Sequence, residues 1–141
     1  MSFSDIYRVS GSAMTAQTVR LNTIASNLAN AESPAATEAA TYKARRPVFA
    51  AVYQNSELMG NRAMSGARVQ VLDVVETGGA VMRHEPGNPL ANTQGNVFYP
   101  DVNVVEEMAD MMSASRNFET NVEVLNSVKS MQQSLLKLGE G

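Results

Sequence analysis

The sequence predicts an α+β protein that is mainly α. A long helix is expected at each end of the chain, the two pairing as an antiparallel coiled coil, with a small irregular β-rich central insertion between them. At both ends, apolar side chains recur at alternating intervals of four and three residues, the spacing of a helix that lies along another helix. All five prolines lie between those ends. One central stretch alternates in the manner of a strand.

The first helix is expected to occupy most of residues 1–30. Ser2 can cap its N-terminus, because Asp5 stands three residues later in the position of a capping box. Asn30 tolerates the left-handed conformation that ends many helices, and Pro34 prevents continuation. The positions with the 4-3 spacing are Phe3, Tyr7, Ser10, Met14, Gln17, Leu21, Ile24 and Leu28.

The middle of the chain is expected to be non-helical. Residues 31–66 follow no regular period and are predicted to be a connector loop, with an extended segment around Pro47. Residues 67–100 are predicted to be a small β hairpin region. Its strands are expected at residues 67–76, 80–84 and 96–99, the first two joined by a turn at residues 77–79.

The last helix is expected within residues 101–141, after Pro100, with Asn103 as its cap and Glu106 in the capping-box position. Its 4-3 positions are Val104, Met108, Met111, Ser115, Phe118, Val122 and Leu125. Beyond the last of these the spacing slips by one residue, because Lys129 falls where an apolar side chain is needed. The apolar stripe is then expected to continue through Val128, Met131, Leu135 and Leu138.

Both helices also carry apolar side chains away from this spacing. On the first helix they form a second row, which comprises Ile6, Val9, Ala13 and Ala16. On the last helix they are scattered and comprise Val105, Met112 and Leu136. A helix that is apolar on more than one side needs more than one partner. The sequence therefore predicts association with other copies or other chains through the terminal helices.

The residues that carry catalysis or bind metals are scarce. His84 is the single histidine and there is no cysteine, so neither a zinc site nor a catalytic triad nor a disulfide framework is expected. The acidic cluster Glu106, Glu107 and Asp110 is interpreted as a solvated helix face that stabilises the helix dipole. The basic cluster Lys43, Arg45 and Arg46 is interpreted as a solvated loop. We predict a non-enzyme without catalytic, metal or cofactor-binding residues and without a cofactor.

The net charge of −3 comes with no basic surface, so nucleic acid is not an expected partner. No stretch is apolar and long enough to span a bilayer, and the amphipathic first 30 residues do not have the pattern of a cleaved signal peptide. Direct lipid insertion is therefore not expected.

Four blocks resemble bacterial flagellar basal-body rod and hook proteins, and most closely the proximal-rod members. The first is residues 11–33, which contain Ser-Asn-Leu-Ala-Asn at residues 26–30. The other three are residues 41–49, 84–108 and 113–139. Two departures from the family pattern are visible, Asn96 in place of an aromatic residue and Asp101 in place of asparagine.

This resemblance implies a structural subunit of the flagellar rod, which forms a tube in the periplasmic space, transmits torque and conducts exported subunits. It implies that the terminal helices pair within each subunit and line the tube. The implied partners are other copies, other rod proteins, the ring and adaptor proteins at the rod base and the type III export apparatus. Export without a cleaved signal makes Phe3 and Ile6 candidates for export recognition, with packing on the helix seam as the alternative.

We expect the assembly interface to comprise Tyr7, Met14, Leu21, Ile24, Asn27, Leu28, Asn30, Met108, Met111, Phe118, Val122 and Leu125. A charge at Leu28 or Val122 is expected to abolish motility by preventing assembly. For Asn27 and Asn30 two interpretations stay open. In the first, Asn30 is a helix stop and Asn27 is a solvated residue near it. In the second, their amides bond across subunits and fix the register of the helices, as buried asparagines do in coiled coils. In the second case, Asn27→Leu preserves helicity but disorders assembly.

Two other classes of function were weighed on the residues. A soluble helical adaptor or export chaperone would bind a partner helix in a groove and stay in the cytoplasm, whereas a rod subunit leaves it. A cell-wall hydrolase would need a catalytic pair that the sequence does not offer.

Overall fold

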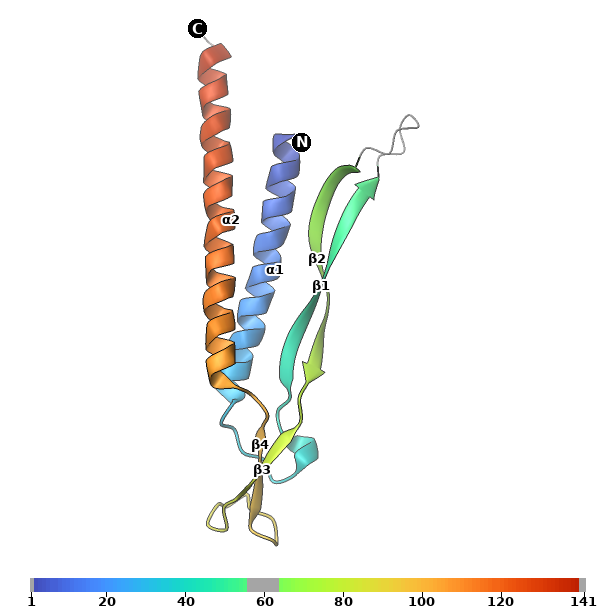
Figure 1. Ribbon diagram of the computed structural model, residues 1–141, viewed down its shortest axis with the longest axis vertical. Coiled ribbons are helices and arrows are strands. Elements are labelled where there is room, and N and C mark those ends of the chain that lie inside the picture. The colour runs from blue at the N-terminus through green and yellow to red at the C-terminus, as the bar shows by residue number, and fades with distance from the viewer. Residues whose placement is uncertain (1, 56–63, 140–141) are drawn as a thin grey trace.

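The structure, a computed structural model, describes residues 2–55 and 64–139. Two long helices and two antiparallel β pairs make up most of it (Figure 1). In chain order the elements are α1 (Phe3–Asn30), the 3₁₀ helix η1 (Glu38–Ala40), β1 (Ala44–Asn55), β2 (Met64–Thr77), β3 (Ala80–His84), β4 (Asn96–Pro100) and α2 (Val104–Gly139). None of the described helices is long and apolar enough to cross a membrane.

Helix α1 lies between two neighbours, α2 on one side and the long ribbon of β1 and β2 on the other (Figure 1). The two helices run in opposite directions, so both chain ends point the same way, and α2 extends beyond the start of α1. The pair β3–β4 lies at the opposite end of the molecule. The expected class, two terminal helices with a small antiparallel β region between them, is confirmed.

Helix α1 begins as the sequence predicts and ends differently. The Asp5 carboxylate accepts a hydrogen bond from the Ser2 backbone N–H at 2.9 Å, which is one half of a capping box. The predicted left-handed end is wrong, because Asn30 is still helical and Ala31 is right-handed, with φ −56°. The Asn30 amide donates to the Ser26 carbonyl at 2.8 Å, which holds it in the last turn.

The predicted hairpin between residues 67–76 and 80–84 is wrong. Strand β2 pairs with β1 instead, and β3 pairs with β4. The turn residue Gly78 has φ +85°, and the neighbouring Gly79 carbonyl accepts from the Asp101 N–H at 3.2 Å. The chain therefore runs on from one sheet to the other at this point rather than reversing.

The extended segment predicted around Pro47 is confirmed as strand β1, so part of the expected connector loop is regular structure. Pro47 lies opposite Val74 in the ribbon. A two-stranded ribbon consists of edge strands only, where a residue without an N–H donor is tolerated. The sequence pattern missed the length of β1 because its apolar and polar residues do not alternate.

The β3–β4 pair is built on buried side chains of β4, Val97 and Tyr99 among them, and on a third backbone segment. Val97 is fully buried. Ala35 and Phe98 exchange two backbone hydrogen bonds, 2.8 and 3.0 Å long, which add a bridge to the free edge of β4. The Tyr99 hydroxyl donates to Glu85 Oε2 at 3.1 Å. Burial raises the pKa of Tyr99, and the hydrogen bond to Glu85 acts in the same direction.

Helix α2 begins as predicted: Asn103 Oδ1 accepts from the N–H groups of Val105 and Glu106, at 3.1 and 3.3 Å. Its inward face differs from the predicted one. Eight of the buried or half-buried positions along α2 recur at intervals of four and three residues, and we call them the inner seam: Glu107, Met111, Ala114, Phe118, Asn121, Leu125, Val128 and Gln132. Asp110 and Ser115 are also half-buried but lie beside this seam. This seam keeps the 4-3 spacing throughout.

The predicted seam shares only Met111, Phe118 and Leu125 with the inner seam. Met108, Ser115 and Val122 are each one residue away from it, and Val104 lies before its start. The slip expected after Leu125 is wrong, because Val128 and Gln132 continue the spacing and the expected stripe beyond them points outward. Its members Met131, Leu135 and Leu138 are 50%, 55% and 78% exposed. Apolarity alone favoured the wrong neighbours, since the inner seam includes a carboxylate, Glu107, and two amides, Asn121 and Gln132.

Gln17 on α1 carries a buried side-chain oxygen, Oε1, that has no hydrogen-bond partner. We expect Gln17→Met to raise the free energy of unfolding by about 1 kcal/mol, because it removes an unsatisfied buried acceptor and keeps the side-chain length. Urea denaturation of the purified chain measures this. Gln132→Met is the control: Gln132 Oε1 accepts from the Tyr7 hydroxyl at 3.2 Å, so that change should lower stability. A less stable Gln17→Met protein contradicts the prediction.

Candidate assembly interface

The second apolar row of α1 is covered within the chain. Ala16 is buried, and Ile6, Val9 and Ala13 are half-buried between α2 and the ribbon. The ribbon is fastened there by a hydrogen bond from the Val69 N–H to Ser12 Oγ, 3.0 Å long. No large apolar side chain of α1 is among the exposed ones. The second row of α1 is therefore covered within the same molecule, where α1 contacts both α2 and the ribbon.

Helix α2 has no such cover on its outer side. Its exposed apolar side chains are spread along its whole length; they are Val104, Val105, Met108, Met112, Val122, Val124, Met131, Leu135, Leu136 and Leu138. We call these residues the outer face of α2. Leu136 and Leu138 are 70% and 78% exposed, in the last turns of α2. The end of α2 extends beyond the start of α1 (Figure 1). Isolated exposed apolar residues are ordinary, but so many along one helix, on two of its flanks, mark an interaction surface.

The predicted interface residues divide between these two surroundings. Met108 and Val122 are 55% and 36% exposed and belong to the outer face. The others are buried or half-buried within the chain: Tyr7, Met14, Leu21, Ile24, Asn27, Leu28, Asn30, Met111, Phe118 and Leu125. Phe3 and Ile6 are also half-buried. Contacts with other copies, and export recognition, stay predictions for these residues.

Asn27 is not the solvated residue of one sequence interpretation, since it is only 1% exposed. Its Oδ1 accepts from the Arg45 backbone N–H at 2.8 Å and from the Tyr42 hydroxyl at 2.9 Å. Its Nδ2 donates to the Arg45 carbonyl at 3.0 Å. The amide thus pairs with the start of β1 as a neighbouring strand would. It ties the ribbon to the last turns of α1.

An ion network joins the start of α2 to both of its neighbours. Arg20 of α1 lies 3.0 Å from Asp110. Arg46 of β1 lies 3.6 Å from Glu106, 3.6 Å from Glu107 and 3.7 Å from Asp110. The expectation of a solvated acidic face is wrong for Glu107, which is 2% exposed, and Arg46 is paired rather than free in a loop.

Sequence reasoning missed this network because the arginine and the carboxylates are about sixty positions apart. Only the fold of the ribbon against α1 brings them together. Two hollows of about 250 and 260 Å³ flank the Arg46–Glu107 contact. The Arg46–Glu107 distance is 3.6 Å, and a hollow lies on either side of the pair. Neither the guanidinium nor the carboxylate is therefore closely packed in every direction.

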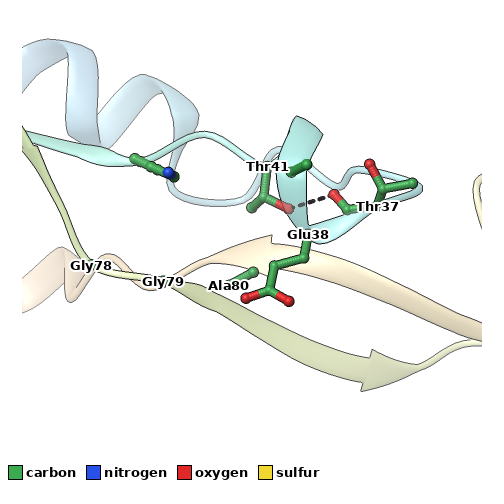
Figure 2. A pocket seen from close by; sticks show the side chains of 8 residues that line it. Thr37, Glu38, Thr41, Gly78, Gly79 and Ala80 are labelled. Atoms are coloured by element: carbon green, nitrogen blue, oxygen red, sulfur yellow. Dashed lines mark hydrogen bonds between the residues drawn. The ribbon is translucent and has the colours of Figure 1, made fainter.

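A larger open hollow of about 570 Å³ lies where the two sheets meet (Figure 2). Its walls are η1 with its flanking residues on one side and Gly78, Gly79 and Ala80 on the other. The Thr41 hydroxyl donates to the Thr37 carbonyl at 3.0 Å, which closes the turn around η1. The described lining brings one carboxylate, Glu38, and the hydroxyls of two threonines to this junction.

Comparisons with known proteins identify the family. Residues 8–34 match the family model described as flagella basal body rod protein, and residues 93–138 match that of the flagellar basal body rod FlgEFG protein C-terminal region. The flagellar basal-body rod protein FlgC of Escherichia coli is 46% identical over 99% of this chain and 100% of its own length. That of Salmonella typhimurium is 43% identical over the same shares, and that of Agrobacterium fabrum is 34% identical over 93% of this chain and 91% of its own length. With matches of this identity and coverage, the chain belongs to the family of flagellar basal-body rod proteins.

Proposed function

We infer that the protein is a structural subunit of the flagellar basal-body rod and that the outer face of α2 carries its contacts with neighbouring subunits. The observation behind this assignment is the asymmetry of the two helices in a chain of this family. α1 has none of the large apolar side chains that are exposed, whereas α2 leaves many apolar side chains exposed along its length. Burying these side chains against other chains provides the hydrophobic driving force for assembly.

The pairing of α1 and α2 within the subunit is proposed to be an antiparallel coiled coil. Its support is the unbroken 4-3 spacing of the inner seam, and the opposite directions of the two helices. The hydrogen bond between Tyr7 and Gln132 and the ion pair between Arg20 and Asp110 lie near opposite ends of the contact. They fix which turns of the two helices face each other.

The arrangement around α1 favours a head-to-tail contact between subunits. The ribbon also exposes apolar side chains, among them Tyr53 at 55% and Leu72 at 60%. The ribbon and α2 lie on opposite sides of α1 (Figure 1). A contact between two different surfaces generates a ring or a helical assembly rather than a closed dimer. A tube of subunits is the assembly that this geometry supports.

The remaining roles follow from family membership as proposals. They are transmission of torque through closely packed helices, export without a cleaved signal, a place in the rod within the periplasmic space, and association with other rod proteins, with the ring and adaptor proteins at its base and with the export apparatus in transit. Close-packed interfaces have low compressibility and so transmit strain. No enzymatic activity is proposed. A soluble adaptor or export chaperone would instead remain in the cytoplasm, so cell fractionation distinguishes that alternative.

Met112 on the outer face of α2 offers a direct test, since it is 59% exposed. We expect Met112→Asp to leave the unfolding free energy of the isolated subunit within about 0.5 kcal/mol, because the substitution is on the surface. In a strain without its own copy of the gene, it should abolish swimming and the appearance of rods in electron micrographs of isolated basal bodies. A carboxylate there prevents burial of the outer face.

Ser113→Asp is the matched control, because Ser113 is the next residue and is an exposed polar position on the same helix. It should assemble and support swimming. Normal rods with Met112→Asp would rule out the outer face near Met112 as the assembly surface. A subunit unfolded by Met112→Asp would show that the side chain has a role within the fold instead.

A further inference from the structure

Helix α2 carries two overlapping sets of positions, each with the 4-3 spacing of a helix seam. One is the inner seam. The other, here the alternative seam, consists of Val104, Met108, Met111, Ser115, Phe118, Val122 and Leu125. Three positions belong to both. Exchanging one seam for the other requires only a rotation of α2 about its own axis by about 50°, half of the angle between successive residues.

Apolarity favours the alternative seam, which would bury Met108 and Val122. The inner seam instead places Glu107, Ala114 and Asn121 toward α1. Glu107 and Ala114 are 2% and 0% exposed, while Met108 is left 55% exposed. The helix pair has therefore settled on the more polar of its two possible faces. A third element must stabilise that choice.

We propose that Arg46 of β1 selects the seam by pairing with Glu107, and so decides which apolar residues of α2 face neighbouring subunits. Arg46 reaches Glu107 from the ribbon, 3.6 Å away, and also reaches Glu106 and Asp110 on the adjoining turns. Without a cation, a carboxylate as buried as Glu107 is strongly unfavourable. With Arg46 beside it, Glu107 can stay inside, and Met108 and Val122 are kept on the outer face.

Arg46 is thus a positioning residue that acts through Glu107. The clamp of Asn27 on the Arg45 backbone holds the neighbouring residue of β1, so the arginine is presented at a fixed place beside α2. The ribbon, α1 and α2 are thereby coupled. This inference rests on the proposed function in one respect, that the outer face is the assembly surface, but the selection of the seam is a property of the single subunit.

The chain has no cysteine, so single thiols can report which way α2 faces. In separate variants, Ala114→Cys marks the inner seam and Val122→Cys the alternative seam. We expect a maleimide to react with the thiol at 122 at least about tenfold faster than with the thiol at 114, because a buried thiol reacts only during local opening. The subunits are labelled at a concentration where sedimentation shows single copies.

Adding Arg46→Gln to each reporter should reverse the order of reactivity, with labelling at 114 becoming faster and labelling at 122 slower. Adding Glu107→Leu as well should restore the original order, because residue 107 is then apolar and its burial on the inner seam no longer needs a cation. Arg68→Gln is the control, because Arg68 is an exposed arginine on the same ribbon. It should change neither rate.

Three results with these variants would overturn the proposal: faster labelling at both positions with Arg46→Gln, which indicates separation of the helices; no change at either position; or a reversal that Glu107→Leu does not undo. Rapid labelling at 114 in the parent would also contradict it. Because labelling is measured on single subunits, failure here is separate from failure of Met112→Asp to block rod assembly. That second failure would instead concern the proposed function.

Discussion

Replacing Asn27 with leucine is expected to lower the free energy of unfolding by about 3 kcal/mol, because it leaves the Arg45 N–H, the Arg45 carbonyl and the Tyr42 hydroxyl without their buried partner. Leucine is similar in size to asparagine but has no polar atoms to replace those bonds. The change should also free the start of β1 from α1. Urea denaturation measures the stability, and hydrogen exchange of the β1 amides measures the release of the ribbon.

Asn30→Leu is the matched control for this substitution. Its amide makes a single hydrogen bond to the Ser26 carbonyl within the same helix, at a half-buried position. We expect a loss below about 1 kcal/mol, since that bond supports only the last turn. Equal losses for the two variants would show that the contacts of Asn27 with β1 add nothing to the stability of the subunit.

This result would change the meaning of an assembly defect in Asn27→Leu. The sequence suggested that such a defect arises from a lost amide contact between subunits. The structure offers a cause inside the subunit, a ribbon that is no longer held at a fixed place on α1. Measuring the stability of the isolated subunit before assembly separates these two causes.

Introducing aspartate at Ala114 is expected to have a larger effect, a loss of about 4 kcal/mol, because it places an unpaired carboxylate at a fully buried position. Ala114 lies in the middle of the inner seam, where α2 contacts α1. The substitution should separate the two helices over several turns. Thermal unfolding followed by circular dichroism gives the loss of stability from the shift of the midpoint.

Ser115→Asp serves as the control, because Ser115 is the next residue along α2 and belongs to the alternative seam rather than the inner seam. At its half-exposed position a carboxylate should cost no more than about 1 kcal/mol. The contrast between the two variants therefore tests the orientation of α2 independently of any assembly. A greater loss for Ser115→Asp than for Ala114→Asp would mean that the alternative seam faces α1.

The sequence by itself determined the two terminal helices, the capping residues Asp5 and Asn103, and the strands predicted at residues 80–84 and 96–99, of which the second is one residue longer in the structure. These features depend on local side-chain chemistry and on periodicity, which are read over a few neighbouring positions. The resemblance of its four blocks also led to the family of flagellar basal-body rod proteins, which the similarity to FlgC relatives confirms.

Only the tertiary structure decided how those elements combine. The pairing of β2 with β1 rather than β3, the burial of Asn27 and Glu107, and the rotation of α2 that exposes Met108 all depend on partners far away in the chain. Local hydrophobicity favours burying Met108 over Glu107, but a cation supplied by β1 reverses that preference. Periodicity shows that a helix has a face to bury. Which face is buried depends on the charges and hydrogen bonds that other elements bring beside it.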